Sequence, residues 1–181
     1  MNADLADFRA AVDDFMQYHP QSPLDWQQKE SFTGLPYFSE NEAFVLDVEV
    51  ERFAVDEPLI EIATNTGDIR PYRRWGRFSF AVDGEQAALV IYSDEHGHEL
   101  FLPFKDKTNG KESYGAGRYL ENHRPGLRHL VGNRLEIDFN YAYNPYCAYN
   151  ESYSCPLPPA ENWLKVPIRA GEKKFELNDN Y

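Results

Sequence analysis

The segment Arg77-Phe-Ser-Phe-Ala-Val-Asp-Gly-Glu-Gln-Ala-Ala-Leu-Val-Ile-Tyr92 decides the fold class. Its two halves, 77–82 and 87–92, are short apolar runs of the kind that form strands. Between them stands Asp83-Gly84, a pair that readily adopts the positive φ angles of a tight hairpin turn. The segment therefore predicts two antiparallel strands joined by a β-hairpin.

Further strand-like runs lie on both sides of this hairpin. In residues 44–51, apolar side chains alternate with mostly acidic ones, which is typical of a half-buried strand. Turn residues separate the runs and no helical pattern lies between them, whereas 121–133 is predicted to be a polar loop. The sequence thus predicts a mainly β fold, an antiparallel β-sandwich or barrel of about eight strands. The other predicted strands are 59–64, 99–104, 113–120, 134–141 and 164–169.

Two N-terminal helices are predicted before the strands. Apolar residues recur at three- and four-residue spacing from Leu5 to Met16, which indicates an amphipathic helix that ends before Pro20. A second, short helix is expected to begin with Ser22 as its N-cap and to end near Phe32. We expect the helical segment 1–34 to pack on the β-domain.

The length and composition suit one folded domain. A chain of 181 residues, 42% of them hydrophobic, buries enough surface to fold without disulfides or metal. We therefore expect residues 1–181 to form a single domain with no cofactor and no metal site.

The charge balance excludes several classes of function. The chain has 18 basic and 30 acidic residues, a formal net charge of −12, and no basic stripe to attract a phosphate backbone or an anionic membrane. No apolar run approaches the ~18 residues of a membrane-spanning helix, and the first residues lack the pattern of a signal peptide. We expect a cytoplasmic protein that binds neither nucleic acid nor membrane. Its oligomeric state stays open, as does adaptation to high salt.

An arginine stands in a strand-like run that two glycines interrupt, Tyr114-Gly-Ala-Gly-Arg-Tyr119. Glycine in a strand often marks a bulge or the close approach of another backbone or a ligand. Alternation places Arg118 among apolar neighbours, where a guanidinium needs a carboxylate partner or an anionic ligand. Two interpretations follow: a buried ion pair without a ligand, or the charge anchor of a pocket.

The segment 135–150 holds further polar candidates. Asp138 and Asn140 lie on the polar side of a predicted strand, which faces either solvent or a barrel interior, where both would be partners of Arg118. Residues 140–150 contain four tyrosines, three asparagines and a cysteine around one proline. Such a segment either lines a pocket with hydroxyl and amide groups or is a loop held by its own hydrogen bonds.

Three remaining residues are candidates for chemistry. Cys147 and Cys155 lack the spacing of a metal site and a base close in sequence, so two buried, inert thiols are the favoured interpretation. A nucleophilic Cys147 is the alternative. Glu161 follows a proline-rich segment and is either a general acid/base or the acid of a short turn, and the second interpretation is favoured.

Three long motifs, 101–120, 138–150 and 155–162 followed by Ala170-Gly-Glu-Lys173, closely resemble the signature of the domain of unknown function 1684 family. Weaker matches lie at 19–24, 34–38 and 70–76. The family occurs in archaea and bacteria and has no assigned activity. The resemblance implies that these residues occupy its signature positions: Tyr114, Gly117, Arg118, Tyr119, Asp138, Asn140, Tyr143, Asn144, Cys147, Tyr149, Cys155, Glu161 and Asn162.

Our leading hypothesis is a β-domain that binds a small polar or anionic molecule in a pocket around Arg118. One alternative is a hydrolase-like enzyme with Asp138 or Glu161 as general acid/base, or with Cys147 as nucleophile. A second alternative is a structural or interaction protein. The predicted ligand contacts are Tyr114, Arg118, Tyr119, Asp138, Asn140, Tyr143, Asn144, Tyr149 and Asn162.

Overall fold

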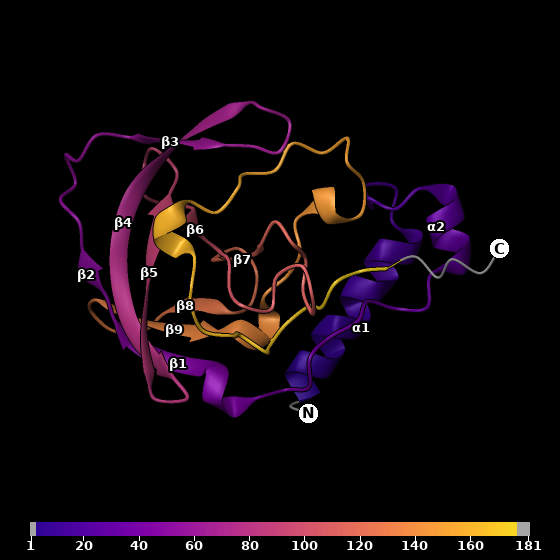
Figure 1. Ribbon diagram of the computed structural model, residues 1–181, viewed down its shortest axis with the longest axis horizontal. Helices are drawn as coiled ribbons and strands as arrows, with labels where there is room; N and C mark the ends of the chain where they lie inside the picture. Colours follow the sequence, from indigo (N-terminus) through magenta and orange to yellow (C-terminus); the bar gives the residue numbers. More distant parts are fainter. Residues whose placement is uncertain (1–2, 177–181) are drawn as a thin grey trace.

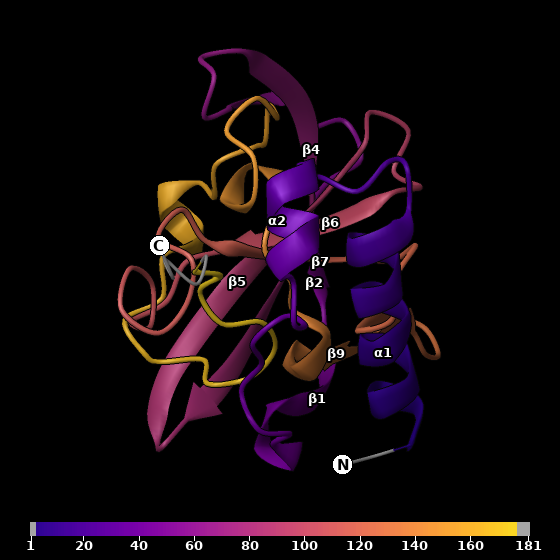
Figure 2. The same ribbon diagram turned by 90° about the vertical axis from the view of Figure 1, so that its right-hand side faces the viewer.

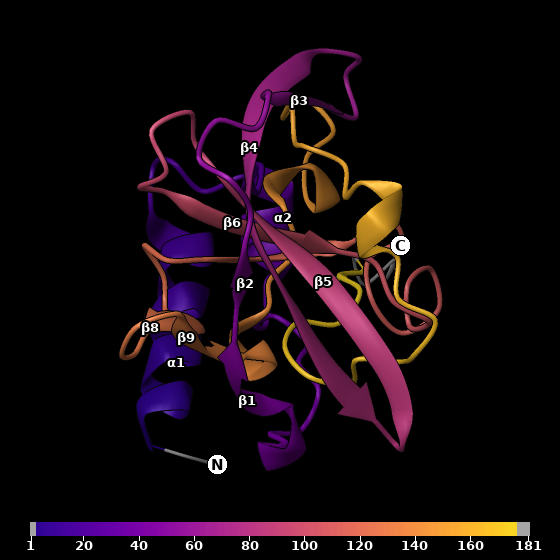
Figure 3. The same cartoon turned by 90° about the vertical axis from the view of Figure 1, so that its left-hand side faces the viewer.

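The predicted hairpin is the longest strand pair of the computed structural model, which describes residues 3–176. Strand β4 (Ile69–Val82) pairs antiparallel with β5 (Glu85–Ser93). At the turn, φ is 50° for Asp83 and 83° for Gly84, the positive values that a two-residue hairpin requires. Figure 3 shows this pair in front.

Two open antiparallel sheets form the β-domain. A three-stranded sheet has the order β1-β9-β8, and a six-stranded sheet has the order β2-β4-β5-β6-β7 with β3 paired to β4. Neither sheet closes on itself, so the fold is a sandwich rather than a barrel. The strands are β1 (Val45–Glu49), β2 (Glu51–Arg52), β3 (Ile60–Ala63), β6 (Leu100–Phe104), β7 (Arg118–Glu121), β8 (Leu127–His129) and β9 (Arg134–Asp138).

The core lies between the sheets. Alternate residues of β4 and β5 point inward, and Leu89 and Ile91 are fully buried, as are Leu135 and Ile137 of β9. Phe139, which follows β9, lies against a ring from each of β4 and β6 and against Phe44. The alternation that predicted these strands therefore marks the face that each one buries.

Both predicted helices are present, and the second begins later than expected. α1 (Ala3–Tyr18) and α2 (Trp26–Ser31) lie on the side of the molecule away from β2 and β4 (Figures 1 and 2). The N-cap of α2 is Asp25, whose carboxylate accepts from the Gln28 N–H at 2.8 Å, while the Gln28 side chain accepts from the Asp25 N–H. Ser22 instead donates to the Met16 carbonyl at 2.5 Å and so closes the turn between the helices. No described helix is long and apolar enough to cross a membrane.

The helical segment is held to the sandwich by buried contacts of α1. Leu5 and Met16 are buried, and the Arg9 guanidinium donates to the carbonyls of Phe38 and Asn140 at 3.4 and 3.2 Å. The Phe8 ring meets the Tyr141 ring edge-on at 5.1 Å. These contacts place α1 against the segment that follows β9.

Four sequence predictions about strands are wrong in part or in whole. The predicted strand 134–141 ends at Asp138, because Phe139–Tyr141 forms a 3-10 helix. Of the predicted strand 113–120, only its end belongs to β7, because 113–117 forms turns. The predicted loop 121–133 contains β8. The predicted strand 164–169 is an irregular segment that contacts 105–107 through single hydrogen bonds. Beyond the strands, the described chain forms four short 3-10 helices, η1 (Glu42–Phe44), η2 (Phe139–Tyr141), η3 (Tyr146–Ala148) and η4 (Ala160–Asn162).

Candidate functional site

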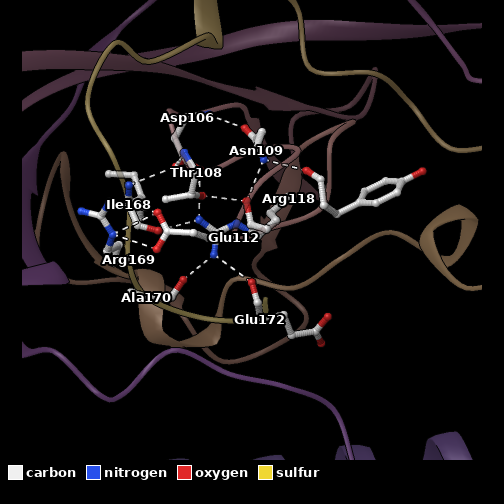
Figure 4. A network of polar contacts seen from close by, with 11 residues as sticks. Asp106, Thr108, Asn109, Glu112, Arg118, Ile168, Arg169, Ala170 and Glu172 are labelled. Carbon is white, nitrogen blue, oxygen red and sulfur yellow. Dashed lines mark hydrogen bonds and ion pairs between the residues drawn. The ribbon is translucent and has the colours of Figure 1, made fainter. Parts of the chain in front are cut away.

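Arg118, the predicted charge anchor, lies in the interior at the start of β7 (Figure 4). Its side chain has no exposed surface, and its Nη2 lies 3.0 Å from the equally buried Asp106 carboxylate. The guanidinium also donates to the carbonyls of Ile168, Ala170 and Glu172. Burial lowers the pKa of Arg118, and the Asp106 carboxylate opposes that shift.

The Asp106 carboxylate is itself held by backbone donors from two segments, the loop before β7 and the segment 168–172. One of its carboxylate oxygens accepts from the backbone N–H of Thr108 at 2.8 Å and of Ile168 at 3.1 Å. The other oxygen receives Arg118. This arrangement is the ion-pair interpretation of the sequence, and it leaves the Arg118 guanidinium no surface on which a ligand could bind. Our prediction of a pocket around Arg118 is therefore corrected. The Arg118 side chain instead links β7 to the segment 168–172.

The side chains of several other predicted contact residues also form hydrogen bonds with the backbone. Asn162, fully buried, accepts from the Val90 N–H at 2.8 Å and donates to the carbonyls of Val90 and Pro103. Asn140 exchanges hydrogen bonds with the backbone of Asn41. Asn144 donates to the Lys173 carbonyl at 2.8 Å. These amides satisfy backbone hydrogen-bonding groups and hold together segments that lie far apart in the sequence.

Asp138 and Glu161, the candidate acids, lie apart from each other and from Arg118. Asp138 caps η2 through the Asn140 N–H at 2.9 Å, and burial raises its pKa. It borders an open groove of about 1030 Å³ beside β8 and β9. Glu161 is exposed and receives both Arg74, at 3.0 Å to each carboxylate oxygen, and the Tyr92 hydroxyl at 2.6 Å.

A different hollow brings together part of the predicted set. We call it the tyrosine pocket, and its volume is about 370 Å³. Four rings form a continuous wall: Tyr72 stacks on Phe101 at 5.3 Å, Phe101 meets Tyr119 at 4.8 Å, and Tyr119 meets Tyr143 at 5.9 Å. The pocket is lined by the rings of Tyr72, Phe101, Tyr119, Tyr143, Tyr146 and Tyr153, and by Arg70, Glu121, His123, Arg124, Ser154 and Cys155, with prolines completing the wall.

The strands and their bridges position this wall. Tyr72 comes from β4, Phe101 from β6 and Tyr119 from β7, which pair side by side in one sheet through β5. The backbones of Tyr119 and Tyr143 exchange hydrogen bonds of 2.9 and 3.1 Å, which attach the tyrosine-rich segment to β7. The sheet therefore fixes three rings, and one isolated bridge fixes the fourth.

Charged groups stand at the edge of the tyrosine pocket. The Arg124 guanidinium lies 3.8 Å from the centre of the Tyr143 ring, the geometry of a cation–π contact. Arg70 donates to the Ser154 carbonyl at 2.7 Å. The Glu121 carboxylate accepts from the Tyr143 hydroxyl and lies 3.1 Å from His123 Nε2. Burial raises the pKa of Tyr119 and Tyr143 well above its ordinary value, so both phenols stay protonated at neutral pH.

The two cysteines are free thiols that lie together in the interior. The Cys147 N–H points at the Cys155 sulfur at 3.4 Å, and the Tyr114 hydroxyl lies 3.7 Å from the Cys147 sulfur. Cys155 lines the tyrosine pocket. Cys147 lines a neighbouring polar hollow of about 570 Å³, together with Tyr114 and Tyr149. Among the described residues, no group of three His, Cys, Asp or Glu side chains is arranged to hold a metal ion.

The structure thus divides the predicted set. Tyr119 and Tyr143 share the tyrosine pocket, whereas Tyr114 and Tyr149 border the polar hollow. The pocket residues that were not predicted from the sequence include Arg70, Tyr72, Glu121, Arg124, Tyr146 and Tyr153. Arg70 and Tyr72 belong to the weaker motif 70–76, and Arg124 lay in the predicted polar loop, where no periodicity marked it.

Comparisons with known proteins agree with the sequence motifs. Residues 30–173 match the family described as "Protein of unknown function (DUF1684)". The structure is similar to the solution NMR structure of an uncharacterised protein of Haloarcula marismortui, with 36% sequence identity and a TM-score of 0.68. That match covers 94% of this chain and 92% of the other. No curated protein matches the chain significantly.

Proposed function

The chain belongs to the DUF1684 family, whose description assigns no activity, and from the geometry we propose that it binds a small anionic molecule in the tyrosine pocket. One observation carries the proposal. Six aromatic rings and two arginines surround a single hollow of about 370 Å³. Ligand pockets for small molecules have volumes of ~300–1,000 Å³ and combine apolar walls with a few charged or polar groups.

The charges favour an anion over a cation. Arg70 and Arg124 stand against a single carboxylate, Glu121, in the pocket lining. The molecule as a whole has a formal net charge of −12. A locally positive hollow on an acidic protein attracts an anion at short range, while the remaining surface repels polyanions such as nucleic acid.

The rings favour a ligand with a flat part. Tyr146 and Tyr153 meet edge-on at 5.2 Å, and neither is fully buried, so both offer ring surface to the hollow. A guanidinium stacked on a tyrosine ring adds a flat, charged contact beside them. The expected ligand is therefore a carboxylate or phosphate attached to a planar group.

The test is a thermal-shift screen with aromatic carboxylates and phosphate monoesters, followed by titration of any hit. At a ligand concentration of 100 Kd, binding should stabilise the protein by ~2.7 kcal/mol. Arg124→Gln should weaken binding at least tenfold. Arg128→Gln is the matched control, because Arg128 is an exposed arginine four positions away that lies outside the tyrosine pocket. Equal affinities for the two variants, or a panel without any hit, would contradict the proposal.

The hydrolase alternative is supported by the position of Asp138, which borders the open groove beside β8 and β9 and whose pKa is raised by burial. A carboxyl group with a raised pKa can act as a general acid. A panel of ester, phosphate and glycoside substrates tests this alternative, and turnover that Asp138→Asn abolishes would support it. Glu161 is less suited to proton transfer because Arg74 and Tyr92 occupy its carboxylate oxygens.

A further inference from the structure

Cys147 and Cys155 form a thiol pair in the wall between two hollows. Cys147 is in η3, and Cys155 directly precedes Pro156, which bridges to Thr64. The backbone of Cys155 is held on both sides, because its N–H donates to the Asn65 side chain at 2.6 Å and its carbonyl accepts from the Asn65 N–H at 3.1 Å. The pair is therefore positioned by structure on both sides and is not a chance encounter of loops.

Each thiol residue borders a different hollow. Cys155 lines the tyrosine pocket and Cys147 lines the polar hollow, although both residues are more than nine-tenths buried. A small reagent in the tyrosine pocket is thus next to Cys155 and not to Cys147. Cys147 is in direct contact with Cys155, because its backbone N–H lies 3.4 Å from the Cys155 sulfur and the two thiols share a hydrogen bond.

The surroundings of the two sulfurs differ in a way that separates their roles. A hydrogen bond from the Cys147 thiol is the largest effect that lowers the pKa of Cys155 to about 6, and backbone N–H groups and Arg70 act in the same direction. The same hydrogen bond, together with burial, raises the pKa of Cys147. Cys155 is therefore the more acidic thiol of the pair, and Cys147 the one that retains its proton more firmly.

We propose that Cys155 and Cys147 are a redox-active dithiol that reacts with small disulfides entering from the tyrosine pocket. The Cys155 thiolate attacks one sulfur of the disulfide, forms a mixed disulfide and expels one small thiolate. The Cys147 sulfur then attacks Cys155, expels the second small thiolate and closes the Cys147–Cys155 disulfide, while its proton goes to a released thiolate. The protein pair loses two electrons and the one proton of Cys147, and one small disulfide becomes one small thiol and one small thiolate, which takes up a proton from water according to its own pKa.

The two cysteines should differ more in their access to the tyrosine pocket than in the intrinsic rate at which their thiols attack a disulfide. At pH 7, a thiol with a pKa of about 6 is roughly 30 times more ionised than one with the ordinary pKa of ~8.5. Its intrinsic nucleophilicity falls by about 13-fold over the same interval, since the Brønsted coefficient is ~0.4–0.5. The net gain in attack rate is only about twofold, so an experiment must trap the intermediate and not merely time the reaction.

The first experiment treats the protein with bis(2-hydroxyethyl) disulfide and measures the intact mass. This probe is uncharged, so its reaction does not depend on the anion contacts proposed above, and the two proposals can fail separately. The wild type should lose both titratable thiols and gain no adduct. Cys147→Ser should accumulate a stable mixed disulfide at Cys155, whereas Cys155→Ser should form at least tenfold less adduct. Adduct mainly at Cys147, or unreactive thiols in a folded wild type that react once urea is added, would overturn the proposal.

The second experiment examines the hydrogen bond between the thiols. The pH dependence of Cys155 alkylation by iodoacetamide is compared in Cys147→Ser, whose hydroxyl can still donate, and in Cys147→Ala, which cannot. The midpoint should stay near pH 6 in the serine variant and rise by at least one pH unit in the alanine variant. Equal midpoints for the two variants would show that the hydrogen bond from Cys147 does not lower the pKa of Cys155. Thermal unfolding of each variant verifies that both fold.

Discussion

At the residue scale, the guanidinium of Arg118 joins the loop of Asp106 to the segment 168–172 without contact with solvent. Sequence reasoning required a carboxylate or an anion beside this arginine, and the requirement is met by Asp106. It proposed Asp138 because alternation suggested a shared interior. Asp138 lies on the other sheet, so its partner choice depends on topology that single-strand patterns do not contain.

Asp106→Asn should destabilise the fold strongly. The substitution keeps the shape of the side chain and leaves the Arg118 charge buried without a counter-charge, which costs ~3–5 kcal/mol in free energy of unfolding. Urea denaturation measures the change. Asp47→Asn is the control, because Asp47 pairs with Arg134 on the surface, where about half of each side chain is exposed. Similar shifts in the two variants would argue against a structural ion pair.

Glu172→Gln should change how stability depends on pH. The Glu172 carboxyl is buried and accepts from the Tyr149 hydroxyl at 2.5 Å and from the Asn144 N–H at 2.9 Å. Burial raises its pKa, so the folded state holds the proton more tightly than the unfolded state does. The stability that this proton contributes is complete below the unfolded pKa of ~4.3 and is lost as pH rises through the raised folded pKa.

Glutamine cannot ionise, so the variant should gain stability relative to the wild type as pH rises from 4 to 8. Urea titrations of both proteins at several pH values measure the difference, in which other titrating groups cancel. A constant difference would show that Glu172 ionises as readily in the folded state as in the unfolded one, and a change in the opposite direction would show that it ionises more readily when folded; either result would contradict the prediction.

At the element scale, Gly117, the glycine directly before β7, has the role that the sequence suggested, the close approach of another backbone. Gly117 has a φ of 109°, and a Cβ atom there would lie 2.6 Å from the Phe104 carbonyl oxygen of β6. The strand prediction for 113–120 was too long, because the backbone turns at Gly117 before it enters the sheet. Periodicity located the strand, and Gly117 marks the point where it begins.

Gly117→Ala should therefore cost more than a substitution at a glycine with free space. Positive φ alone costs an alanine ~1–2 kcal/mol, and at Gly117 the contact with backbone adds to this cost. Gly132→Ala is the control, since Gly132 has a φ of 66° and nothing within 4 Å of the added atom. Chemical denaturation should rank Gly117→Ala as the more destabilising variant by at least 1 kcal/mol, and equal losses would contradict the argument.

The elements that sequence reasoning found share one property, an apolar face along their own length. β8 lacks it, because only Leu127 among its residues is buried and its place is set by pairing with β9. The segment 164–169 has the alternation, with Val166 and Ile168 buried. It does not form a strand, because Pro167 has no backbone N–H to donate and no strand of the described chain pairs with the segment. Hydrophobic periodicity in the sequence thus predicts which face of an element is buried, but it does not predict which segment supplies its hydrogen-bond partners.

At the scale of the whole molecule, the sequence predicted the sandwich and the helical segment but not the location of the candidate site. The tyrosine pocket is assembled from β4, β6, β7 and the segment 143–156, which are separated along the chain. The abundance of tyrosine in 140–150 indicated an unusual segment. Only the pairing of Tyr119 with Tyr143 determines which strand it meets, and that pairing is a tertiary contact.

The net charge of −12 leads to an expectation for the molecule as a whole. Carboxylates that outnumber basic groups by this margin repel one another more in the compact state than in the unfolded chain, so this repulsion destabilises the folded state. Salt shortens the Debye length from ~30 Å at 0.01 M to ~8 Å at 0.15 M and weakens this repulsion. It also weakens the exposed ion pairs, but each of those contributes little.

Stability should therefore increase with NaCl between 0.01 and 0.5 M at pH 7. We expect a gain of about 1 kcal/mol or more, which corresponds to a rise in Tm of roughly 2–4 °C per kcal/mol for a chain of this length. The same titration near pH 4.8, the isoelectric point of the sequence, is the control. There the net repulsion is absent, so an equal gain at both pH values would assign the effect to salt acting on apolar surface instead of to charge.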